Sequence, residues 1–190
     1  MSKVGRLAHR WERTLLQRVY GFDRWHVGHA GEVYAGDIVR SLNDWPADTR
    51  RAVVEIGCGL GDILRRLHFT ERLRLDRDRG ALDAARFLAR FQVGPAPRFE
   101  PFEFPGTELS GVYNAIVMVN WIHQVDQETL ARALRTYAAS HLLPGGAIVL
   151  DTVDDPAYEH NHDVRTLGWP GASIEQLGRY ARNRRVWVLR

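Results

Sequence analysis

The residues Val53-Val54-Glu55-Ile56-Gly57-Cys58-Gly59-Leu60-Gly61 decide how this chain folds. An apolar run passes into three glycines, one at every second position. Glycine lets the backbone turn tightly and approach a ligand where a Cβ would collide. A dinucleotide-binding loop has the spacing G-x-G-x-x-G and would need glycine at position 62, where this chain has Asp62. The stretch therefore predicts a strand over 52–56 and a turn that is not of the nicotinamide-binding type; a glycine-rich turn without a ligand is the alternative.

Downstream of this turn, short apolar runs alternate with helical patterns. Further strands are predicted at 73–75, 98–102, 114–119, 147–151 and 186–189, and helices at 62–67, 81–91 and 127–142, the last capped by Asp126. Residues 174–177 form either a strand or part of a helix over 173–180. Strands that are apolar throughout belong to a parallel sheet covered on both faces. We therefore expect a doubly wound α/β fold: a mostly parallel seven-stranded sheet, helices on both faces and a C-terminal antiparallel hairpin.

The N-terminal part of the chain has a helical pattern. Apolar residues at helical spacing predict a first helix that ends at Gly21, and a second helix is predicted over 32–42. No linker, internal repeat or low-complexity segment divides the sequence. We expect a single domain over 1–190, with a helical part at 1–45 and an α/β core at 52–190.

The composition is that of a packed globular protein. Of the 190 residues, 45% are hydrophobic and 26% are charged, and the formal net charge is +3. The single cysteine, Cys58, excludes an internal disulfide and a cysteine-based zinc site. No apolar run approaches the roughly 18 residues that span a bilayer, and the N-terminus lacks the apolar core of a signal peptide. We expect a cytoplasmic protein that does not enter a membrane and for which nucleic acid is an unlikely partner.

Asp76 provides a second indication of a nucleoside-like ligand. It lies at the predicted end of the second strand, about 20 residues after Gly57. A carboxylate at this place accepts hydrogen bonds from both hydroxyls of a ribose. Asp78 takes this role if the strand ends later.

Two later segments complete an ordered set of motifs. Ile122-His123-Gln124-Val125 follows the predicted fourth strand, and Leu142-Leu143-Pro144-Gly145-Gly146 precedes the fifth. Together with the glycine loop and Asp76, these segments resemble class I S-adenosylmethionine-dependent methyltransferases of the small-molecule type. The resemblance covers about half of the chain closely, and the end of the chain loosely resembles the closing hairpin of that family.

The sequence departs from the family at two places. Asn114 stands where the family usually has Asp, and no Gly-Asp pair follows the third strand, so the group that contacts the adenine is undefined; Glu100 and Glu103 lie nearby but out of pattern. The Asn/Asp-Pro-Pro-Tyr/Phe motif of many nucleic-acid and glutamine methyltransferases is absent, and Asn120-Trp121 stands in its place. This absence argues against those acceptors.

The resemblance implies S-adenosyl-L-methionine as the cofactor and a set of residues that bind it. The implied cofactor-binding residues are Glu55, Gly57, Cys58, Gly59, Gly61, Asp76 and Asn120. It also implies that residues 1–45 form a lid over the cofactor. Trp25 and His26, in Trp25-His26-Val27-Gly28-His29, and Trp121 would then face the substrate; simple packing of Trp25 is the alternative.

Three histidines are candidates for catalysis. His123 follows the fourth strand, where it would act as a general base or hydrogen-bond the substrate, or else only shape the pocket. His160 and His162 lie in the loop after the fifth strand. They would form a second pair of bases or line a polar loop. A local H-x-H with Glu159 or Asp163 is weak evidence for a metal, and we expect none.

The sequence therefore predicts a methyltransferase that acts on an oxygen or nitrogen of a small molecule. RNA or protein acceptors, bound by the arginine-rich C-terminal part, and a non-catalytic binding protein of the same fold are the alternatives. With no large inserted substrate domain, the acceptor would be held by the N-terminal helices and short loops, or by the partner in a homodimer.

Overall fold

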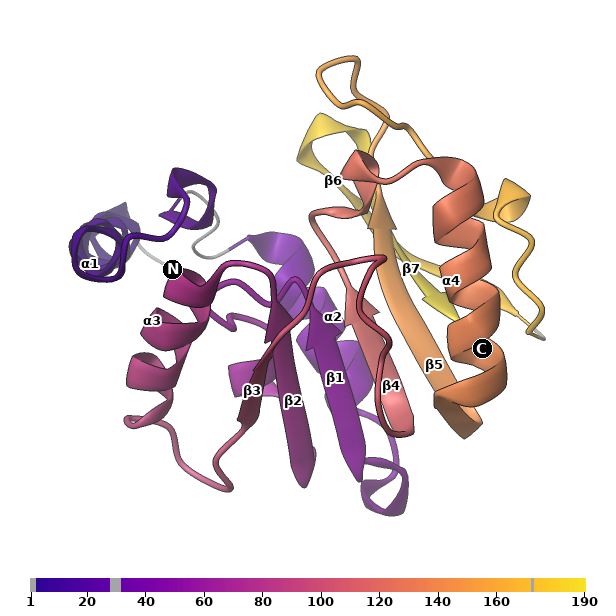
Figure 1. Ribbon diagram of the computed structural model, residues 1–190, viewed down its shortest axis with the longest axis horizontal. Helices are drawn as coiled ribbons and strands as arrows, with labels where there is room; N and C mark the ends of the chain where they lie inside the picture. The colour runs from indigo at the N-terminus through magenta and orange to yellow at the C-terminus, as the bar shows by residue number, and fades with distance from the viewer. Residues whose placement is uncertain (1–2, 28–31, 172) are drawn as a thin grey trace.

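A computed structural model describes residues 3–27, 32–171 and 173–190, with side chains from residue 10 onward, and is built around one seven-stranded sheet (Figure 1). The strand order is β3-β2-β1-β4-β5-β7-β6. The first five strands run parallel, and β7 pairs antiparallel with both β5 and β6. The strands are β1 (Ala52–Ile56), β2 (Glu71–Asp76), β3 (Arg98–Pro101), β4 (Tyr113–Met118), β5 (Leu142–Thr152), β6 (Ile174–Tyr180) and β7 (Arg184–Leu189). The predicted mostly parallel sheet with a C-terminal antiparallel pair is confirmed.

Helices cover both faces of this sheet, as predicted. On one face, α4 packs Leu130 and Leu134 against Val54 and Ile56 of β1 and their neighbours. Successive side chains of a strand point to opposite faces of the sheet, so Val53 of β1 lies on the other face from Val54. There, α2 packs Ile38 and its neighbours against Val53. The remaining helix pair, α1 and α3, packs together beyond the β3 edge (Figure 1). The helices are α1 (Lys3–Tyr20), α2 (Val33–Asn43), α3 (Arg79–Ala89) and α4 (Gln127–Ser140).

The prediction of a helix over 62–67 is wrong. The chain forms only a short 3-10 turn there, η3 (Leu64–Arg66). The backbone N–H of Leu64 donates a hydrogen bond to the buried carboxyl group of Glu55, at 3.2 Å. The side chains of Ile63, Leu64 and Leu67 are all buried. The connection from the glycine loop to β2 is therefore compact and irregular.

Two further boundaries differ from the sequence-based expectation. The helix predicted to reach 142 ends at Ser140, and β5 begins at Leu142, so Pro144-Gly145-Gly146 lies within the strand rather than before it. Residues 174–180, for which strand and helix were both open, form strand β6. None of the helices in the described part of the chain is long and apolar enough to cross a membrane.

Candidate active site

The glycine loop leaves the carboxyl end of β1 in a conformation that requires its glycines. Gly57, Gly59 and Gly61 all have positive φ, at 73°, 51° and 75°. Their surroundings also leave no room for a side chain. A Cβ on Gly57 would collide with the indole of Trp121, and one on Gly59 would lie 2.8 Å from Nδ1 of His26. The alternate spacing of the glycines thus follows from both backbone conformation and close packing.

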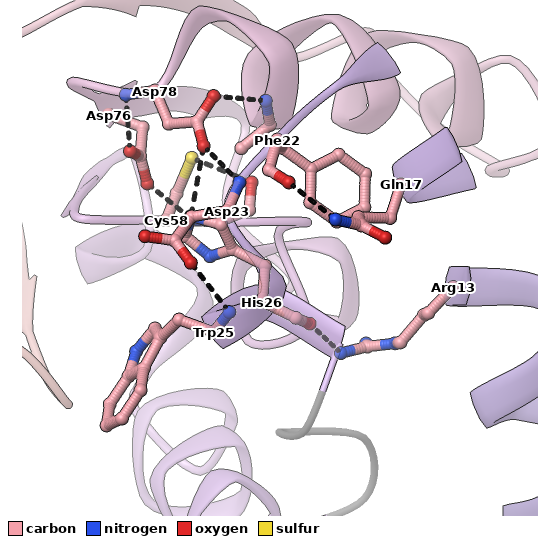
Figure 2. Close-up of polar contacts among 11 residues, drawn as sticks. Arg13, Gln17, Phe22, Asp23, Trp25, His26, Cys58, Asp76 and Asp78 are labelled. Carbon is pink, nitrogen blue, oxygen red and sulfur yellow. Dashed lines mark hydrogen bonds and ion pairs between the residues drawn. The ribbon is translucent and has the colours of Figure 1, made fainter. Parts of the chain in front are cut away.

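Asp76 holds this loop from the end of β2. Its side chain is buried, and its carboxylate accepts hydrogen bonds from the backbone N–H groups of Gly59, at 2.7 Å, and Asp78, at 2.9 Å. Asp78 in turn caps α3 by accepting from the N–H of Ala81, and it accepts a second bond from the N–H of Asp23 (Figure 2). The two carboxylates therefore join the loop, α3 and the N-terminal segment.

The N-terminal segment closes over the loop through α1 and the short 3-10 helix η1 (Arg24–Val27). His26 lies against Gly59, with its Nε2 3.7 Å from a carboxylate oxygen of Asp78. The buried side chain of Arg13 donates a hydrogen bond to the carbonyl oxygen of His26 (Figure 2). Arg13 also forms an ion pair with Asp62. Gly28 and His29, which belong to the same predicted lid motif, lie outside the described residues.

A cavity of about 510 Å³ lies at the carboxyl ends of β1, β2 and β4. Its lining is strongly acidic, with six carboxylic acids and two arginines, and it carries the rings of Trp25, Tyr34, Phe102, Phe104 and Trp121. The predicted site residues among its lining are Trp25, His26, Glu55, Gly57, Cys58, Gly59, Asp76, Asn120 and Trp121. The structure thus brings together residues from four separate sequence motifs.

Glu55 and Gly61 share a buried neighbour, Arg74, that the sequence did not indicate. Arg74 of β2 is fully buried, and its guanidinium fills the space where a Cβ on Gly61 would lie, at 2.7 Å. Gly61 itself does not line the cavity. Burial raises the pKa of Glu55 to about 8, while the charge of Arg74 opposes this rise. The carboxyl group of Glu55 is therefore mostly protonated, and uncharged, at neutral pH.

Asn120 is held at the end of β4 by two residues from distant strands. Its backbone has a positive φ of 72°, which is uncommon for a residue other than glycine. The carboxylate of Asp151 accepts a hydrogen bond from its N–H at 2.6 Å, and Arg184 donates to its side-chain oxygen at 2.9 Å. Asp151 and Arg184 also form a buried ion pair. These contacts fix the side of the cavity that Asn120 and Trp121 form.

The three candidate catalytic histidines do not line the cavity. His123 is buried, with its ring centre 4.1 Å from that of Tyr158 and 6.2 Å from that of the cavity residue Trp25. Burial, with Arg184 and His162 nearby, lowers the pKa of His123 to about 4, so its ring is neutral at pH 7. The ring of His162 is hydrogen-bonded to the carbonyl oxygen of Ile122, at 3.0 Å.

His160 lies farther out, beside His162, with the two ring centres 6.1 Å apart. This pair supports the segment that carries His123, because the N–H of His160 also donates to the carbonyl oxygen of His123. Among the residues that the structure describes, no group of three His, Cys, Asp or Glu side chains could hold a metal ion.

Sequence reasoning missed several residues of the cavity. Phe102 and Phe104 follow β3 and line the cavity on either side of Glu103, which the sequence analysis had named only as out of pattern. Their position just after a parallel strand was the available signal. Arg13 lies far from the other motifs in sequence, and Asp23 lies just before Trp25; nothing in the local pattern of either residue distinguishes it.

Comparison with solved structures identifies the fold. The chain resembles N-methyltransferase NodS from Bradyrhizobium japonicum WM9 in complex with S-adenosyl-L-homocysteine, with a TM-score of 0.70, 16% identity and coverage of 95% of this chain and 96% of that chain. It also resembles magnesium protoporphyrin IX methyltransferase from Synechocystis PCC 6803 with bound S-adenosylmethionine, with a TM-score of 0.66, 16% identity and coverage of 94% and 88%.

A third solved structure, an S-adenosylmethionine-dependent methyltransferase from Clostridium acetobutylicum ATCC 824, aligns with 62% of this chain and 48% of its own length, at a TM-score of 0.52 and 17% identity. No family model and no curated protein matches the chain in sequence. The order of the strands, the glycine loop after β1 and these likenesses lead to one conclusion: the chain has the fold of the class I S-adenosylmethionine-dependent methyltransferases.

Proposed function

We propose that this protein is a methyltransferase that uses S-adenosyl-L-methionine to methylate an oxygen or nitrogen of a small molecule. The observation that carries the proposal is the cavity at the glycine loop, where Asp76 stands at the end of β2. The solved structures with this fold include proteins described as methyltransferases with bound S-adenosylmethionine or its product. The cavity also has the acidic and aromatic lining that binding of S-adenosylmethionine would require.

The charge of the cavity fits this cofactor. S-adenosylmethionine carries positive charge on its sulfonium and amino groups, and five carboxylic acids line the cavity in addition to the protonated Glu55. Methyl transfer removes the sulfonium charge, so an acidic site would hold the product less strongly than the cofactor. Arg13 is a buried cation on the same wall, where it would bind the carboxylate of the methionine part.

Individual residues can be assigned to parts of the cofactor. Asp76 would accept hydrogen bonds from the ribose hydroxyls. The backbone of Gly57 and Gly59 would approach the methionine part, as the missing Cβ atoms allow. Phe102 and Phe104 would enclose the adenine, and Glu103 would contact its edge.

The protein has two tasks in the reaction once the cofactor supplies an activated methyl group. It must align the acceptor with that group, and it must exclude water from it. Trp121, fixed by a 2.6 Å hydrogen bond from its Nε1 to the carbonyl oxygen of Ile56, and Trp25 would orient the acceptor. Residues 1–45 would form the lid. His123 packs behind Trp25 outside the cavity, and its pKa of about 4 makes it a weak base, so it would act by shaping the pocket through Trp25.

Calorimetry with S-adenosyl-L-homocysteine tests the proposal. The native protein is expected to bind this ligand, and Asp76→Asn to weaken binding by about 1.5–3 kcal/mol, because a charged acceptor of hydrogen bonds is lost. Asp83→Asn is the matched control, since Asp83 is an exposed acid on the nearby helix α3. If the native protein shows no binding at millimolar ligand, the proposal fails.

A further inference from the structure

Helix α1 is apolar on the side that faces away from the protein. Its inner side buries Arg13 and Leu16. On its outer side, Trp11, Leu15 and Val19 are 70%, 63% and 68% exposed. These three residues, which we call the outer row, follow one another at intervals of four and therefore lie along one line of the helix. A surface helix normally carries polar residues there, so the outer row needs an explanation.

The surface around the outer row is basic. Arg10 and Arg18 are exposed on α1, and α3, which packs against α1, adds three exposed arginines. The exposed acids on the described parts of these two helices are Glu12 and Asp83. These arginines are Arg79 and Arg86 of α3 and Arg90, which directly follows its last residue; Arg86 forms an ion pair with Asp83, at 2.6 Å. Figure 1 shows both helices at the side of the molecule, beyond the β3 edge of the sheet.

The outer row could be covered by a second copy of the chain or by a lipid surface, and the charge around it favours the lipid. A second copy of the chain that covered the outer row with its own would bring two sets of arginines together, which is unfavourable. An anionic lipid surface matches the arginines in sign, and Trp and Leu side chains are suited to the boundary between headgroups and acyl chains. We propose that α1 lies on an anionic phospholipid bilayer, with the outer row inserted and the arginines of α1 and α3 at the headgroups.

The same helix connects this surface to the cavity. Arg13 lines the cavity from the inner side of α1, while the outer row lies on the opposite side. A helix with its side chains is about 10–12 Å across, so docking would bring one wall of the cavity to about that distance from the bilayer. The proposal does not depend on the identity of the cavity's ligand.

Sedimentation with lipid vesicles tests this inference. The full chain is expected to bind vesicles of phosphatidylcholine that contain phosphatidylglycerol, to bind pure phosphatidylcholine vesicles far less, and to lose binding as salt rises. The variant Trp11→Ser/Leu15→Ser/Val19→Ser is expected to bind at least about tenfold more weakly, because it removes the apolar area that would be buried. Arg10→Gln/Arg18→Gln/Arg90→Gln is expected to remove the preference for phosphatidylglycerol.

The matched control is Val33→Ser/Val112→Ser, which changes exposed valines elsewhere, 70% and 51% exposed, and is expected to bind like the native protein. Calorimetry with S-adenosyl-L-homocysteine and circular dichroism would show whether the triple serine variant remains folded. The inference is overturned if the native protein does not bind the anionic vesicles, or if the folded serine variant binds them equally. It is also overturned if the native protein is a dimer that ignores vesicles and the serine variant is a monomer, because a second copy then covers the outer row.

Discussion

The carboxyl group of Glu55 is buried next to Arg74 at the base of the glycine loop, and its protonation is linked to stability. Its pKa is about 4.5 in the unfolded chain and about 8 in the folded protein, because burial disfavours the charged form. Its contribution to stability is therefore complete below about pH 4.5 and is lost as the pH rises through 8. Glu55→Gln cannot titrate, and its amide oxygen can still accept the hydrogen bond from Leu64.

We expect the melting temperature of Glu55→Gln, relative to that of the native protein, to increase from pH 5 to about pH 8 and then to level off, because above pH 8 the carboxyl group is ionised in both the folded and the unfolded chain. Thermal unfolding at a series of pH values would measure this. Glu71→Gln, at an exposed glutamate, is the control and should show no such trend. A constant difference between Glu55→Gln and the native protein would contradict the prediction.

His123 has the opposite dependence on pH. Burial and nearby Arg184 lower its pKa from 6.5 to about 4, so the unfolded chain takes up its proton first as the pH falls. The native protein should lose stability between pH 6.5 and pH 4, by up to about 3 kcal/mol from this residue. Denaturant unfolding should show that His123→Asn loses less free energy of unfolding between pH 6.5 and pH 4 than the native protein does. The control, His68→Asn at an exposed histidine, should lose as much as the native protein.

At the scale of elements, the sequence predicted most of the sheet but not the connections that shape the site. Ala52–Ile56 was predicted residue for residue, because an apolar run before a glycine loop has few other structures open to it. The helix over 62–67 failed, since the hydrogen bond from Leu64 to Glu55 competes with the helical pattern. The pairs Arg13–Asp62 and Asp151–Arg184 join residues 49 and 33 positions apart, and no local pattern reports such pairs.

The contact of α1 with the glycine loop depends on one of these pairs. Arg13→Gln would remove the ion pair with Asp62 and leave a smaller group in a buried place. We expect a loss of about 1–3 kcal/mol, concentrated in the N-terminal segment. Limited proteolysis should cleave this variant faster within residues 10–27, where Arg10→Gln, on the exposed side of the same helix, should be cleaved at the native rate. Equal rates for both variants would show that the pair does not hold the segment.

At the scale of the whole molecule, α2 is part of the core although it comes before the first strand. Ile38 is fully buried, and its cluster includes Val53 of β1 and Val186 and Val188 of β7. Ile38→Ala is expected to lower the free energy of unfolding by about 2–5 kcal/mol, because it leaves a cavity in this cluster. Urea unfolding should show one transition for fluorescence and circular dichroism. Val33→Ala, at the exposed start of the same helix, should change stability by less than about 0.5 kcal/mol.

The position of α2 also affects how the chain is made. Tyr180 donates a hydrogen bond to Asp37 of α2 from 143 residues farther along, and the ring of Tyr34 packs against Tyr180 and beneath Arg184. A ribosome adds about 5–20 residues per second, so α2 waits on the order of ten seconds before these partners emerge. Earlier partners of α2, such as Val53 and Phe69, are made within the first half of the chain, whereas the contacts from Tyr180 and Arg184 form only at this late stage. The cluster around α2 is therefore assembled in two stages, and its last contacts join segments from opposite ends of the described chain.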